Sequence, residues 1–126
     1  MSAYRDIYVR KIFTSEVVTA GSTAESALID LGNFSNTGDF GVQVSLSGSG
    51  TGRIGYKVSN TTLDADFKKP STSPYIKSGM LATSGTDSDG KDSFSFSPYL
   101  HRYMKLTIEE TGSSSSITVS IIMAAQ

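Results

Sequence analysis

Apolar and polar side chains alternate at a period of two through most of the last third of the chain. The alternation covers Phe94 and Phe96, then Met104 to Ile108, and then Ile117 to Met123. Successive side chains of a β-strand point to opposite faces, so each apolar set lies on one face of a sheet. The pattern predicts a strand of alternating Ser and Phe, followed by two strands that pair with each other through a Gly-Ser turn.

The first half of the chain shows similar alternation. Phe40 to Leu46 and Ile54 to Val58 flank a Gly-Ser-Gly-Thr-Gly loop, and this arrangement predicts a hairpin. Ile7 to Val18 is predicted to be extended and bent near Phe13 to Ser15, because one alternation does not run through it; it fits an edge strand or an arm. Tyr75 to Thr83 is predicted as one broken strand.

One segment is ambiguous between helix and strand. Ser22 and Glu25 have the spacing of a capping box, and Gly32 is placed to end a short helix. Ser26 to Leu31 is nevertheless short for a globular helix and runs into turn-rich sequence, so we favour a strand. Residues 60–73 and 85–92 are predicted as polar loops.

These elements predict an all-β fold in a single domain. The strands number about eight, which is enough for two packed antiparallel sheets in a jelly-roll-like β-sandwich. Residues 1–20 are expected to form an N-terminal strand or arm, and residues 21–126 the sandwich itself. At 126 residues the chain is long enough to bury a core without disulfides.

Composition removes several classes of function. The chain has no Cys and a single His, so thiol chemistry and multi-histidine metal centres are excluded within one chain. Eleven Lys and Arg against 12 Asp and Glu give a net charge of −1, which does not favour nucleic-acid binding. Neither a signal peptide nor an apolar run of membrane-spanning length is recognisable, so we expect synthesis in a host cytoplasm and no membrane partner.

The motifs with possible chemistry are weak. Gly50 to Gly55 has the Gly-x-Gly-x-x-Gly spacing of dinucleotide-binding loops, but a strand follows it where that motif requires a helix. His101 has no Gly-x-Ser-x-Gly motif to accompany it. Glu109 and Glu110 are adjacent in a strand and therefore point to opposite faces. We predict no catalytic residue and no cofactor.

One loop could bind a cation. Asp87, Asp89 and Asp92 lie within six residues and could offer oxygen ligands to Ca²⁺. Their spacing is not that of an EF-hand, and a solvated turn with Asx-type hydrogen bonds is the simpler interpretation. Ca²⁺ is therefore a weak candidate ligand here.

Three segments resemble a known class of proteins. Gly48 to Ser59, Thr83 to Asp92 and Phe96 to Leu106 are similar to short β-rich proteins encoded in the structural gene clusters of tailed phages and prophages. The similarity begins at about Phe40, and residues 1–31 add nothing specific to it. It implies a virion protein, such as a capsid decoration or cement protein or another head or tail accessory protein. The closing strands also resemble discoidin-type sandwich domains, which bind glycans or other ligands through their loops.

The resulting expectation is a non-enzymatic virion structural protein that forms homo-oligomers on a repeating lattice. A major capsid protein is the expected partner, and apolar and aromatic surface the expected contact. The alternative is a carbohydrate-binding module that uses the Asp87 to Asp92 loop and nearby Tyr residues. The predicted contact residues are Tyr4, Ile7, Tyr8 and Val9 in the arm, and Tyr75, Tyr99 and Tyr103 near one end of the sandwich.

Overall fold

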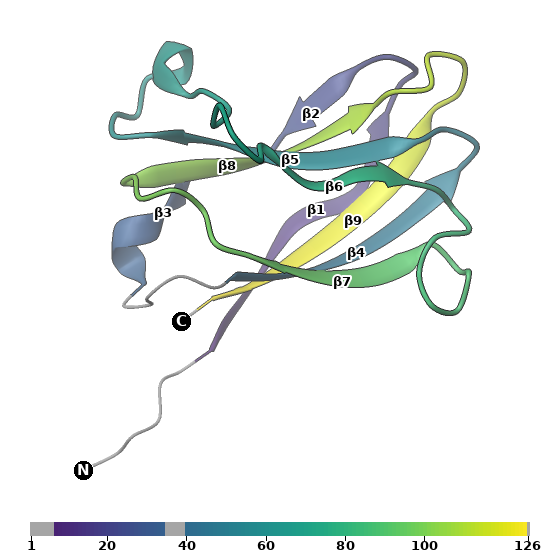
Figure 1. Cartoon of the computed structure of the whole chain (residues 1–126), viewed down its shortest axis with the longest axis horizontal. Coiled ribbons are helices and arrows are strands. Elements are labelled where there is room, and N and C mark those ends of the chain that lie inside the picture. The colour runs from purple at the N-terminus through teal and green to yellow at the C-terminus, as the bar shows by residue number, and fades with distance from the viewer. Residues whose placement is uncertain (1–6, 35–39, 126) are drawn as a thin grey trace.

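Two antiparallel β-sheets face each other across one core (Figure 1). The computed structural model describes residues 7–34 and 40–125, which form nine strands and two 3-10 helices. In chain order these are β1 (Tyr8–Val18), β2 (Thr23–Glu25), β3 (Ile29–Asp30), η1 (Leu31–Asn33), β4 (Phe40–Gly48), β5 (Gly52–Ser59), η2 (Asp64–Asp66), β6 (Tyr75–Met80), β7 (Lys91–Phe96), β8 (Tyr103–Glu110) and β9 (Ile117–Ala125). The predicted all-β, single-domain sandwich is confirmed.

The chain passes repeatedly from one sheet to the other. Sheet A has the order β1-β9-β4-β7, and sheet B has the order β2-β8-β5-β6 with β3 also paired to β8. All of these strand pairs are antiparallel. This strand order puts β1 and β7 at the edges of sheet A and β6 at one edge of sheet B.

Two predicted strand pairings are wrong. β4 and β5 lie in opposite sheets and form no hairpin, and the same is true of β8 and β9. Their alternating apolar faces meet across the core instead, an arrangement that produces the same sequence pattern as pairing side by side. The two connecting loops cross between the sheets at one end, where the Gly50 N–H donates to the Ser116 carbonyl over 3.3 Å.

The core is made by the predicted apolar sets. Side chains of β4, β5, β8 and β9 are buried at every second position, as strands that cover a core on one face require. The buried apolar residues of these four strands are Phe40, Val42, Val44, Leu46, Ile54, Tyr56, Val58, Met104, Leu106, Ile108, Ile117, Val119, Ile121, Met123 and Ala125. Phe94 and Phe96 on the edge strand β7 are only half-buried.

The first extended segment is an edge strand. β1 pairs with β9 along its length, with register shifts on both sides of Phe13. The predicted bend is confirmed: Ser15 adopts a φ of +48°, and its N–H donates to the Ser120 hydroxyl over 2.9 Å. Such irregularities discourage further strand pairing at this part of the edge.

The ambiguous segment is divided among three short elements. β2 ends at Glu25, β3 covers Ile29 and Asp30, and η1 follows at once, so the predicted single strand is correct only in part. Ser26 interrupts the pairing: its N–H donates to the Leu106 carbonyl, while its hydroxyl accepts from the Leu106 N–H over 2.9 Å.

Buried Glu110 closes the end of the sandwich where the loops cross. Its carboxylate accepts hydrogen bonds from the backbone N–H groups of Gly21, Thr51, Gly112 and Ser113, at 3.0, 2.9, 2.7 and 2.7 Å. These donors come from three loops that are distant in the sequence. Glu110 therefore joins the loops at this end, which leaves the opposite end for other contacts.

Candidate functional site

Aromatic rings collect at the end of the sandwich where β4 begins and β7 ends. The ring of Tyr8 is edge-on to Phe34 with centroids 6.0 Å apart, and Phe34 is 5.8 Å from Phe40. Phe96 then lies 5.9 Å from Phe40 and 5.4 Å from Tyr56. Rings at these separations attract each other by about 0.5–1.5 kcal/mol per pair beyond their burial. The series leads from exposed Tyr8 to buried Tyr56, and we call this region the aromatic end.

The segment from Pro98 to Arg102 joins β7 to β8 across the aromatic end (Figure 1). Its last residue is anchored by two groups. The Arg102 guanidinium donates to the Asp30 carboxylate over 2.7 and 3.0 Å, and the Arg102 backbone N–H donates to the Asn60 side-chain oxygen over 3.0 Å. The hydrogen bond from Arg102 lowers the pKa of Asp30. At the middle of the segment, Leu100 is 98% exposed.

Two hollows flank this segment and share Asn60, Tyr99, Leu100 and His101. The first hollow, of about 730 Å³, is lined mostly by polar residues, among them Ser59, Thr61, Asp66, Ser71 and Thr72. The second, of about 720 Å³, has a more apolar lining that includes Leu31, Phe34, Phe40 and Pro98.

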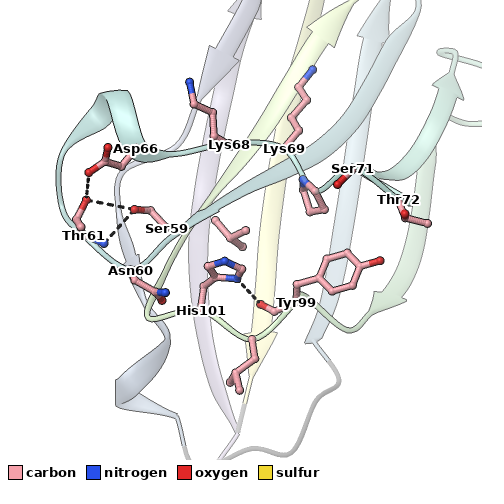
Figure 2. Close-up of a pocket in the computed structure, with 13 residues that line it drawn as sticks. Ser59, Asn60, Thr61, Asp66, Lys68, Lys69, Ser71, Thr72, Tyr99 and His101 are labelled. Atoms are coloured by element: carbon pink, nitrogen blue, oxygen red, sulfur yellow. Dashed lines mark hydrogen bonds between the residues drawn. The ribbon is translucent and has the colours of Figure 1, made fainter.

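Figure 2 shows that some of the polar groups of the first hollow are hydrogen-bonded within it. The Thr61 hydroxyl bonds to Asp66 and lies 3.3 Å from the Ser59 hydroxyl. The hydrogen bond of His101 Nδ1 is to the backbone oxygen of Tyr99, at 3.4 Å, and not to a Ser hydroxyl or a carboxylate. A Ser-His-Asp triad requires the histidine to contact both a Ser hydroxyl and a carboxylate, which this contact of His101 does not provide.

The outer face of sheet B carries charge that is neutralised within the chain. Glu109 accepts from Arg53 over 2.9 Å and from Lys69 over 2.8 Å, and the Tyr75 ring lies 4.3 Å from the Arg53 guanidinium carbon. Burial raises the pKa of Glu109, but the two cationic partners outweigh it and the net shift is downward. Lys105 adds an ion pair with Asp64. This face therefore offers few free charges to a partner.

Thr107 is a weak point beneath that layer. Its residue is 0% exposed, and its hydroxyl has no hydrogen-bond partner among the described residues. Replacing Thr107 with Val keeps the shape and removes the unpaired hydroxyl, so we expect unfolding in urea to require about 1 kcal/mol more free energy. The matched change is Thr118→Val, at a half-buried position of β9. It should change the free energy of unfolding by less than about 0.5 kcal/mol. A loss of stability in Thr107→Val would contradict the assignment of an unpaired hydroxyl.

The outer face of sheet A is different, because its two central strands carry no charge there. The outward residues of β9 and β4 are Thr118, Ser120, Ile122, Ala124, Gly41, Gln43, Ser45 and Ser47. Charged side chains on this face, such as Lys11 and Lys91, belong to the edge strands β1 and β7. A shallow hollow of about 490 Å³ lies on the face around Gly41.

The predicted contact residues are only partly brought together. Tyr8 and Tyr99 are exposed at the aromatic end, and Ile7, which precedes Tyr8 in the chain, is also exposed. Tyr103 lies under Arg102, whose guanidinium carbon is 5.4 Å from its ring. Val9 is exposed on the outer face of sheet A. Tyr75 is not near the other two tyrosines, since it packs on Arg53 in sheet B, and Tyr4 lies outside the described residues.

The carboxylate loop lies away from these tyrosines. It connects β6 to β7 at the opposite end of the molecule from the Pro98 to Arg102 segment (Figure 1). Asp89 and Asp92 accept hydrogen bonds from nearby backbone N–H groups, at 3.1 and 2.8 Å. Across residues 7–34 and 40–125, no group of three or more His, Asp or Glu is placed to hold a metal ion. Because the loop with Asp87 and the segment with Tyr99 lie at opposite ends of the molecule, these two residues do not form one glycan site.

Two features of the surface were not predicted. Leu100 is a single Leu in a polar segment, and sequence does not distinguish an exposed Leu of this kind from a buried one. The hollow around Gly41 is lined by residues from four strands, so predicting it required the strand order.

In the described part of the chain, no helix is long and apolar enough to span a membrane.

Comparisons with known proteins give similar structures but no family. No family model matches the sequence. No curated protein matches it either. Similar solved structures include the SPBc2 prophage-derived protein YomS, with 16% identity, a TM-score of 0.49, and 99% of this chain and 100% of that chain covered.

Two other similar structures belong to proteins whose names give two different functions. The periplasmic g-type lysozyme inhibitor PliG from Aeromonas hydrophila has 12% identity and a TM-score of 0.49, with 100% of this chain and 91% of that chain covered. A carbohydrate-binding module of endoglucanase Cel5A from Eubacterium cellulosolvens has 12% identity and a TM-score of 0.45, with 92% and 98% covered. Similarities of this size do not transfer a function, so the functional argument rests on the surface of this chain.

Proposed function

We propose that this small all-β protein is a non-enzymatic structural component of a phage-type virion, present in many copies on a repeating lattice. Capsid decoration or cementing, or another accessory role in the head or tail, is the specific form of the proposal. The observation that carries it is the set of exposed apolar and aromatic side chains at one end of the sandwich: Ile7, Tyr8, Tyr99 and Leu100.

The aromatic end suits contact with another protein. Large rings and a projecting Leu supply apolar area with few rotatable bonds, so little conformational entropy is lost when they are covered. Anchoring by Arg102 on Asp30 and Asn60 holds the segment in place before a partner arrives. Repetition over a lattice allows each individual contact to be weak, because the contacts act together.

The test is made on particles. Virions purified from a phage or prophage that carries the gene are expected to contain the chain in many copies, measured by quantitative mass spectrometry. The double variant Ile7→Asp/Tyr99→Asp should reduce the copy number at least tenfold, since it places two charges on the contact surface. Leu63→Asp, at a residue equally exposed elsewhere, is the matched control and should be incorporated normally. Absence of the chain from wild-type particles would reject the proposal.

Glycan binding is the second candidate function. It is favoured by the first hollow, which is lined by the exposed Tyr99 together with hydroxyl and amide side chains (Figure 2), a combination suited to sugars. A glycan array would detect it, and Tyr99→Ala should abolish the signal. If the chain binds glycans and is absent from virions, the glycan-binding proposal would replace the structural one.

A further inference from the structure

The hollow on the outer face of sheet A is a receptor surface without an assigned occupant. One row across its floor joins Val9, Ala124, Gly41 and Ser95, each paired with the next through the sheet. A Cβ added at Gly41 would meet nothing within 4 Å, so the missing side chain creates open space at the centre. None of the described residues that line the hollow is ionisable.

The chain also carries an apolar projection that suits such a surface. Leu100 is exposed over 98% of its area and lies at the tip of an anchored segment. Its surroundings on the aromatic end are different residues from those that line the hollow on sheet A. A projection and a hollow on separate parts of one surface can both be used at the same time by neighbouring copies.

We propose that Leu100 of one copy inserts into the hollow around Gly41 on sheet A of the next copy. The occupant is thus a second copy of this chain, and the contact is heterologous, since different surfaces of the two copies meet. The uncharged lining favours this occupant, because covering it removes no charge from water. Each copy then gives its Leu100 to one neighbour and receives Leu100 from another, which produces a ring or an open chain.

This inference deepens the proposed lattice function and rests on its self-association step, but it is tested on purified protein without particles. Sedimentation velocity should show the wild-type mass rising with concentration beyond that of a dimer. Leu100→Asp removes the projection and Gly41→Arg fills the hollow, so each variant alone should associate at least tenfold more weakly.

Mixing the two variants gives the decisive result. Leu100→Asp keeps an intact hollow and Gly41→Arg keeps an intact projection, so an equimolar mixture should form one contact per pair. Assembly should stop at the dimer, because the remaining projection is lost and the remaining hollow is filled. A face-to-face contact between two sheets would give no such restoration.

Matched variants separate the contact from general effects of charge. Leu63→Asp changes another exposed Leu, and Gly79→Arg changes another Gly whose added Cβ would meet nothing within 4 Å. Both should associate as the wild type does. A monomeric wild type at high concentration, normal association of either test variant, or a mixture that stays monomeric would each overturn the inference.

Cysteine cross-linking provides a second measurement that does not depend on charged variants. The sequence has no Cys, so a mixture of Leu100→Cys and Gly41→Cys chains has one thiol on each. Mild oxidation with a copper catalyst should cross-link this pair at least tenfold faster than a mixture of Leu100→Cys and Gly79→Cys. Equal rates in the two mixtures would overturn the inference. Loss of this contact with normal incorporation into virions would leave the proposed function standing.

Discussion

Replacing Glu110 with Gln is expected to lower the midpoint of thermal unfolding by roughly 10 °C or more. The Glu110 residue is 3% exposed and its Oε2 accepts from the N–H groups of Thr51 and Gly112 at 2.9 and 2.7 Å. Gln keeps one oxygen but turns the other acceptor into an NH₂ donor. Whichever way the amide is oriented, two backbone donors then face another donor, and buried donors without acceptors are costly.

Glu109→Gln is the matched control for that variant. It makes the same chemical change at the adjacent residue, whose partners are the side chains of Arg53 and Lys69 on the outer face of sheet B. Those long side chains can reach water when the carboxylate is lost, so we expect a shift of about 3 °C or less. Equal shifts in the two variants, measured by circular dichroism, would contradict the special role of Glu110.

The same carboxylate should make stability depend on pH in the acid range. Hydrogen bonds from Thr51 and Gly21, then from Gly112 and Ser113, lower the pKa of Glu110 from 4.5 to about 2. A depressed carboxyl pKa stabilises the folded state fully above the unfolded value and progressively less as pH falls toward the folded value. Wild type should therefore lose stability between pH 4.5 and 2 more steeply than Glu110→Gln. Asp30, Asp64 and Glu109 also have lowered pKa values, but both proteins contain them.

The fold class was predictable because the core residues occupy every second position of the strands. Val42 and Val44 in β4, or Val119 and Ile121 in β9, are buried at the positions that the period of two assigned. The bend in β1 was also predictable, since its alternation shifts at Phe13 and the structure places register shifts there. Local pattern thus determined which side chains face the core.

Strand partners were not predictable in the same way. An inward-facing strand satisfies its pattern by pairing with the next strand or by facing it across the core, and β4 and β5 illustrate the second solution. The choice depends on positions such as Gly48 at the end of β4, where φ is +101° and an added Cβ would lie 2.7 Å from the Ser116 carbonyl oxygen. That contact joins residues far apart in the sequence, so no local signal reports it.

The candidate surface was predictable in part for a related reason. Tyr99 and Tyr103 were predicted as contact residues near one end of the sandwich, and Tyr99 is exposed there. Tyr75 was predicted near the same end, yet it lies on β6 at the edge of sheet B, where it pairs with Gly55 of β5. Side chains that meet across strands become visible only once the sheet order is known.

The division between the two ends now has a physical basis. Glu110 holds three loops together through their backbone N–H groups, so that end is already satisfied within the chain. The aromatic end leaves Tyr99 and Leu100 exposed, and apolar side chains lose nothing by being covered. A rigid, internally bonded end and an apolar, unpartnered end suit a subunit that makes directional contacts with copies of itself.

Replacing Gly90 with Ala is expected to reduce the free energy of unfolding by at least about 3 kcal/mol. Gly90 has a φ of +77°, and a Cβ there would lie 2.2 Å from the Leu46 carbonyl oxygen and 2.9 Å from that of Ala82. Both obstacles are backbone atoms, so no side chain can move aside. The Gly90 carbonyl also accepts from the Leu46 N–H over 2.8 Å, and relief of the clash would break that bond.

Gly79→Ala is the control for Gly90→Ala, because an added Cβ there meets nothing within 4 Å and Ala restricts the unfolded chain. We expect that variant to be more stable than the wild type by about 0.4–1 kcal/mol in urea unfolding. Hydrogen exchange at the Leu46 amide should accelerate in Gly90→Ala and stay unchanged in Gly79→Ala.

Because the Gly90 turn leads into β7, whose Ser93 and Ser95 line the hollow on sheet A, Gly90→Ala should also weaken self-association. A Gly90→Ala protein as stable as the wild type would show that the turn can rearrange without moving β7.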